Sequence, residues 1–184
     1  MFLEVKRMNL RSTIGRLPFA LLLLSAMPLA AQGNCQPVFD ALSKVTTTST
    51  HIYVAMNAVP NGGDKPRTIE TIYAAGAIYT RVGGKWNRSP VTPQQVVKQE
   101  QENRQRSNFT CRYLRDESVN GETAGLYSTH AETADQKSDG QIWISKIRGL
   151  PLRQEIDIDT GGKTGKNHSS MRYEYGNVQP PQEP

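Results

Sequence analysis

The chain has 184 residues, with 22 lysines and arginines against 17 aspartates and glutamates. Four of the basic residues and one acidic residue fall within positions 1–31, which leaves 18 basic and 16 acidic residues, a net charge of +2, in the remainder. So small a net charge does not favour binding to a phosphate backbone, and we expect no nucleic-acid partner.

Residues 1–31 have the layout of a secretory signal peptide. Basic residues between Lys6 and Arg16 come before an apolar run at 17–27, and small residues follow up to Ala31. This order is typical of a cleaved signal, and the apolar run is shorter than the roughly 20 residues of a bilayer span. We therefore expect cleavage near Ala31 and a periplasmic or secreted protein, with a retained membrane anchor as the alternative.

Both cysteines, Cys35 and Cys111, lie beyond the predicted cleavage site. An even pair of cysteines in an exported chain predicts a disulfide. The alternative is a lipidated Cys35, for which the preceding residues 32–34 are a poor context because they lack the expected aliphatic residue.

The N-terminal half of the remainder reads as one helix followed by antiparallel strands. Apolar residues at 38, 41, 42 and 45 have the spacing of a helix with one buried face. Beyond it, apolar and β-branched residues alternate with polar ones between glycine-rich turns, which predicts strands. These predicted strands are 51–56, 67–74, 77–82 and 85–88.

A second helix is predicted from Thr92 to Arg106. Thr92 is a suitable N-cap, Pro93 takes the first helical position, and Gln95 completes a capping box. Val96 and Val97 are the only apolar residues in the rest of the helix. The helix can therefore bury only a small face, and it should lie across a surface or along a sheet edge.

The C-terminal half reads as a second group of antiparallel strands. Within 141–159, apolar and polar residues alternate on either side of a turn at Gly149, whose missing side chain permits the turn conformation. Residues 133–140 are polar and read as a loop, and the proline-rich tail 179–184 should be frayed. The other predicted strands are 109–115, 126–130 and 168–177.

No arrangement of residue types in the sequence specifies an active site. His51, His130 and His168 are not spaced as metal ligands, although they could converge in space. The glycine-rich stretch 161–167 departs from the phosphate-loop spacing, and the carboxylates of 155–159 read as a solubilising stripe or a cation site. We therefore predict a protein that is not an enzyme and uses no cofactor or metal.

Three short segments resemble the C-terminal part of exported proteins with the lipoprotein-carrier fold, the LolA-like and outer-membrane lipoprotein-sorting proteins. They are Ile-Trp-Ile-Ser-Lys at 142–146, Gly-Leu-Pro-Leu-Arg at 149–153 and Arg-Tyr-Glu-Tyr-Gly-Asn-Val at 172–178. Ser145 stands where that family usually has aspartate. The resemblance implies an α+β fold over 32–178: a single curved antiparallel β-sheet, an unclosed half-barrel, covered by one to three helices around an apolar cavity that accepts acyl chains.

The predicted function is therefore the binding of a hydrophobic ligand, a lipid or a lipoprotein by a monomer. Apolar side chains on the inward faces of the strands include Ile52, Ile156 and Met171. We expect the following to line the cavity: Val54, Met56, Leu126, Ile142 and Ile144. The alternative is an envelope protein–protein interaction module with a filled core, whose partner would contact large aromatic residues on the outer sheet face: Trp143, Tyr173 and Tyr175.

Overall fold

The computed structural model describes residues 34–57, 67–161 and 166–182. The predicted signal peptide lies outside the described residues, and every element below falls within Ala31–Pro184. The helices are α1 (Gln36–Val45) and α2 (Pro93–Arg106). The strands are β1 (Thr50–Asn57), β2 (Arg67–Ala74), β3 (Ala77–Val82), β4 (Lys85–Arg88), β5 (Asn108–Val119), β6 (Glu122–Glu132), β7 (Lys137–Ser145), β8 (Pro151–Asp159) and β9 (Lys166–Tyr175).

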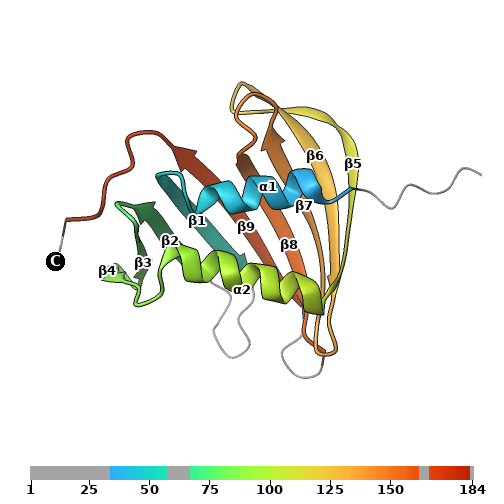
Figure 1. The fold of residues 1–184 in the computed structure, drawn as a ribbon, viewed down its shortest axis with the longest axis horizontal. Helices are drawn as coiled ribbons and strands as arrows, with labels where there is room; N and C mark the ends of the chain where they lie inside the picture. Colours follow the sequence, from blue (N-terminus) through green and yellow to red (C-terminus); the bar gives the residue numbers. More distant parts are fainter. Residues whose placement is uncertain (1–33, 58–66, 162–165, 183–184) are drawn as a thin grey trace, which may run out of the picture. The chain divides into compact units, whose positions relative to one another are not determined.

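The nine strands form one antiparallel sheet in the order β4-β3-β2-β1-β9-β8-β7-β6-β5. Each of the two strand groups is a meander, and α2 carries the chain from the β4 edge to the β5 edge. The last strand, β9, then pairs with β1 and joins the groups. Both helices lie across the same face of a curved sheet (Figure 1). The predicted fold, an unclosed curved sheet covered by helices, is confirmed.

The β5–β6–β7 region is longer than the sequence predicted. Asn120 and Gly121 both have positive φ angles, 51° and 83°, and form a two-residue turn between β5 and β6. The two strands therefore stay paired up to this turn. Lys137 pairs with Glu132 on one side and Asp159 on the other, so part of the predicted loop 133–140 belongs to β7. Polar side chains at these strand ends are exposed, and backbone pairing rather than apolar alternation extends the strands.

Two hydrophobic clusters lie on opposite faces of the sheet. Beneath α1, Val38 and Ala41 pack against Ile142 and Ile144. The neighbouring residue Trp143 points to the other face, because successive side chains of a strand alternate. There it packs in the second cluster, which consists of Ala124, Leu126, Trp143 and Leu152.

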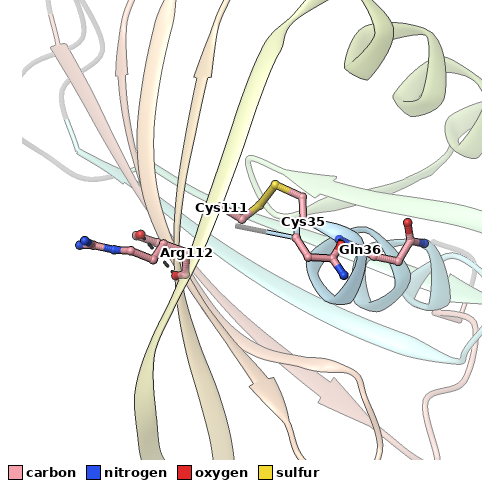
Figure 2. Close-up of a disulfide and its surroundings, with 6 residues drawn as sticks. Cys35, Gln36, Cys111 and Arg112 are labelled. Carbon is pink, nitrogen blue, oxygen red and sulfur yellow. Dashed lines mark hydrogen bonds between the residues drawn. A yellow bond between two sulfur atoms is a disulfide. The ribbon is translucent and has the colours of Figure 1, made fainter. Parts of the chain in front are cut away.

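The disulfide predicted between Cys35 and Cys111 is confirmed (Figure 2). It joins the residue before α1 to strand β5, with a Cα–Cα separation of 5.1 Å. Next to it, the rings of Phe39 and Phe109 lie 5.1 Å apart. The N-terminal end of α1 is thus held on the β5 side of the sheet by a covalent bond and an aromatic contact.

Candidate ligand pocket

A pocket of about 420 Å³ lies between α1, α2 and the helix-bearing face of the sheet. Its volume falls within the range of roughly 300–1,000 Å³ that is usual for small-molecule sites. Its walls combine apolar side chains from both helices with apolar and aromatic side chains from the sheet. They include Val38, Leu42, Val45, Ile52, Tyr73, Val96, Val97, Phe109, Ile156, Met171 and Tyr173.

Helix α1 supplies one wall of the pocket, because some of its apolar side chains border the pocket while others pack on the sheet. Val45 borders the pocket, Ala41 packs on the sheet beneath the helix, and Leu42 does both, since it borders the pocket and packs against the core cluster. Val38 belongs to both surfaces, since it is almost fully buried in the cluster and also borders the pocket. The pocket is therefore continuous with the folded core along α1.

Helix α2 supplies the opposite wall with its only two valines. The predicted capping box is present: the Gln95 amide N–H donates to Thr92 Oγ1 at 3.3 Å, and the Thr92 amide N–H donates to Gln95 Oε1 at 2.8 Å. Among the residues of α2, only Pro93 is buried. Val96 and Val97 are half-buried and border the pocket, so the small apolar face of this helix meets an unfilled space rather than a packed core.

Two tyrosines give the floor of the pocket polar groups. The Tyr173 hydroxyl donates to Gln154 Oε1 at 2.8 Å, and burial raises the pKa of Tyr173, so its phenol stays neutral. Burial, followed by the charge of Glu100, also raises the pKa of Tyr73. Within the described residues, the Tyr73 hydroxyl has no hydrogen-bond partner, which leaves it free to bond a polar group of a ligand.

Among the described residues, the charged side chains that border the pocket, Glu100 and Arg104, both belong to α2. Glu100 is exposed, and Arg104, one turn further on, is half-buried. The Arg104 guanidinium lies over the Phe39 ring of α1, 4.3 Å from its centroid. The described lining is therefore mainly apolar, with some hydroxyl and amide side chains among it, and one cation and one carboxylate lie at its rim.

None of the five residues predicted to line the cavity lies on the walls of this pocket. Ile142 and Ile144 are on the expected face, but α1 covers them. Leu126 pairs with Trp143 and shares its cluster on the other face. Val54 and Met56 lie further along β1 from Ile52 and are half-buried.

The residues that do line the pocket carried partial signals in the sequence. Ile52, Ile156 and Met171 were recognised as inward-facing by alternation, but which inward positions a helix would cover depends on where α1 docks. The stronger signal was the pair Val96 and Val97, isolated in an otherwise polar helix. Trp143 and Tyr173, predicted as outer-face contacts, are buried at 6% and 8% exposure.

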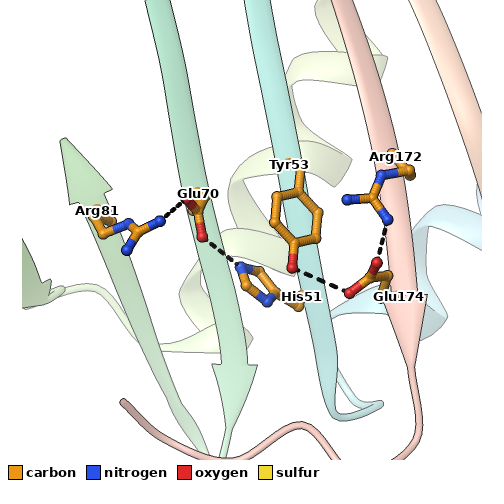
Figure 3. Close-up of polar contacts among 6 residues, drawn as sticks. All are labelled: His51, Tyr53, Glu70, Arg81, Arg172 and Glu174. Atoms are coloured by element: carbon orange, nitrogen blue, oxygen red, sulfur yellow. Dashed lines mark hydrogen bonds and ion pairs between the residues drawn. The ribbon is translucent and has the colours of Figure 1, made fainter. Parts of the chain in front are cut away.

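The three histidines lie on strands of the sheet, and each pairs with a carboxylate. His51 contacts Glu70, and two other pairs, His130 with Asp139 and His168 with Asp157, form across neighbouring strands. Figure 3 shows how Glu70 also binds Arg81, while Tyr53 donates to Glu174, which pairs with Arg172. In the part of the chain that the structure describes, no group of three or more histidine, cysteine or acidic side chains is arranged to hold a metal.

Comparison with family models finds no match, and comparison with curated proteins finds none. Among solved structures, LprF from Mycobacterium bovis is similar with a TM-score of 0.41 and 11% identity, over 82% of this chain and 95% of LprF. MucB, solved in complex with MucA, is similar with a TM-score of 0.43 and 13% identity, over 78% of this chain and 56% of MucB.

A LolA superfamily protein from Nitrosomonas europaea is also similar, with a TM-score of 0.30 and 12% identity, over 76% of this chain and 91% of that protein. No helix within 34–57, 67–161 and 166–182 has the length and apolar character needed to cross a bilayer.

Proposed function

We propose that this protein is an exported, non-enzymatic monomer that binds a hydrophobic ligand, an acyl chain or lipid, in the pocket between α1, α2 and the sheet. The binding domain would be 32–178, with 1–31 removed as a signal peptide and 179–184 as a tail. The disulfide between Cys35 and Cys111 supports an oxidising compartment, because such bonds rarely persist in the cytosol.

One observation carries the proposal: beyond Pro93, the only apolar side chains of α2 are Val96 and Val97, and both border the unfilled pocket. Of the residues of α2, only Pro93 is buried, and an apolar ligand would add contacts with Val96 and Val97. Each methylene group removed from water contributes about 0.8 kcal/mol, so each added methylene should tighten binding about fourfold. The gain should stop once the chain fills the pocket.

The test uses an apolar fluorophore whose emission rises on leaving water, together with native mass spectrometry of the purified protein. Thr129, on the floor of the pocket, is replaced by tryptophan to occupy the space. Thr110, an exposed residue on the edge strand β5, receives the same substitution as a matched control.

We expect wild type and T110W to take up the fluorophore and T129W to lose at least tenfold in affinity. In mass spectra, wild type should carry apolar adducts that T129W lacks. Equal uptake by T129W and T110W, both folded by circular dichroism, would show that the probe binds elsewhere, and the proposal would then fail.

A further inference from the structure

The charged residues of α2 fall into two pairs that the structure treats differently. On the solvent side, Glu102 and Arg106 form an ion pair at 3.8 Å, with side chains 46% and 75% exposed. On the pocket side, Glu100 and Arg104 have the same spacing along the helix, yet within the described residues neither side chain forms an ion pair or a hydrogen bond. Among the residues that the structure describes, no group forms an ion pair with this cation or this carboxylate at the rim of the pocket.

The Arg104 guanidinium is held in place by aromatic contacts. It lies 4.3 Å from the centroid of the Phe39 ring, and that ring contacts Phe109 at 5.1 Å. Stacking occupies only the flat face of a guanidinium and leaves the N–H groups at its edge free to bind an anion in a bidentate manner. The disulfide at Cys35 anchors the start of the helix that carries Phe39. Arg104 thus presents a positioned set of donors beside the apolar wall.

Glu100 gives the rim a direction. Besides burial, the negative charge of Glu100 raises the pKa of Tyr73, on β2. Arg104 instead lies over the ring of Phe39, beside Phe109 of β5. An anion at the rim is therefore attracted toward the Phe109 side and repelled from the Tyr73 side. Replacing Arg104 and replacing Glu100, one helical turn apart on α2, should therefore change the affinity for an anion in opposite directions.

We propose that the pocket binds a single-chain amphiphile with an anionic head group, with the chain inside the pocket and the head group on Arg104. This inference rests on the proposed function and narrows its ligand class. The shared chemistry is an anionic oxygen head on one alkyl chain, whether a fatty carboxylate or an alkyl phosphate. A pocket of about 420 Å³ is near the lower end of the usual range for ligand sites, which suits one chain.

The test measures dissociation constants by calorimetry, below the micelle-forming concentrations, for palmitate, hexadecyl phosphate and the uncharged hexadecanol. Acetate and inorganic phosphate serve as head groups without a chain. The variants are R104Q and E100Q at the rim, with R106Q and E102Q as controls that make the same charge changes on the solvent side of α2.

Wild type should bind palmitate and hexadecyl phosphate more tightly than hexadecanol, and should not bind acetate or phosphate at comparable concentrations. R104Q should weaken both anionic amphiphiles about tenfold, since a charge-assisted hydrogen bond is lost. E100Q should tighten them about threefold, which is the size expected for removing one like charge close to an anion in water. Neither should change hexadecanol binding, and R106Q and E102Q should change little.

Two failures can be told apart. If wild type binds none of the three long-chain compounds, the proposed function itself fails. If it binds hexadecanol as tightly as palmitate, or if R104Q weakens both equally, the pocket binds chains but Arg104 is only a packing residue, and the head-group inference is overturned. Tight binding of free phosphate lost in R104Q would indicate an anion site that needs no chain, which also overturns it.

Discussion

Breaking the bond between Cys35 and Cys111 should remove a large part of the stability of this protein. The bond closes a loop with a sequence separation of 76 residues. In the chain-entropy model, a loop of that size contributes about 4.5 kcal/mol by restricting the unfolded chain. Globular proteins are stable by only about 5–15 kcal/mol in total. Loss of this one bond should therefore bring the folded state close to the limit at which it persists.

The assay is urea unfolding followed by circular dichroism, for wild type, for wild type with the disulfide reduced, and for the C35A/C111A variant. Cys111 is 4% exposed, so its truncation to alanine also removes core contacts, and the double variant should be slightly less stable than the reduced protein. A loss below about 1 kcal/mol in protein whose thiols are shown to be free would refute the reasoning. It would mean that the reduced, unfolded chain already keeps these two segments together.

Two further predictions concern the pH dependence of ion pairs. The hydrogen bond to Asp157 raises the pKa of His168 above its ordinary value near 6.5, so its stabilisation is complete below that pH and is lost as the pH rises through the raised pKa. H168Q should therefore flatten the dependence of the urea midpoint on pH above about pH 6.5, and an unchanged slope would contradict the assignment. Hydrogen bonds from Arg148 and Ser145 lower the pKa of Glu122, so its stabilisation is present above its ordinary pKa and is lost in acid. E122Q should cost about 1–2 kcal/mol at pH 7 in urea unfolding and much less once the pH has fallen through the lowered pKa of Glu122; an equal loss at neutral and at acid pH would show that charge plays no part.

Most of the architecture could be predicted because it depends on local patterns. The spacing of the apolar residues in 37–45 indicated α1, the Thr92 capping box marked the start of α2, and the alternation on either side of Gly149 indicated β7 and β8. The lengths of the strands were harder to predict from the sequence. Strands such as β5 extend through polar residues because neighbouring backbones pair, and single-strand patterning does not report this pairing.

The pocket was harder to locate than the fold because it depends on where two helices lie over the sheet. Ile142 is as inward-facing as Ile156, yet the first lies beneath α1 and the second borders the pocket. Leu126 shows a second limit. Leu126 lies on the same face of the sheet as Trp143 because the two residues pair across β6 and β7. Predicting that face requires the register of this hairpin, which the mixed polar and apolar residues of β6 do not reveal.

The pairing of β1 with β9 has a consequence for the order of assembly during synthesis. Thr50–Asn57, the first strand made, lies between β2 and a strand that ends at Tyr175. Until β9 has been synthesised, one edge of β1 would therefore stay unpaired, and the two groups of strands could not join. Contacts so distant along the chain form slowly. The protein would need β9 before it could fold completely. Truncation before residue 166 should leave two half-sheets that cannot pair with each other.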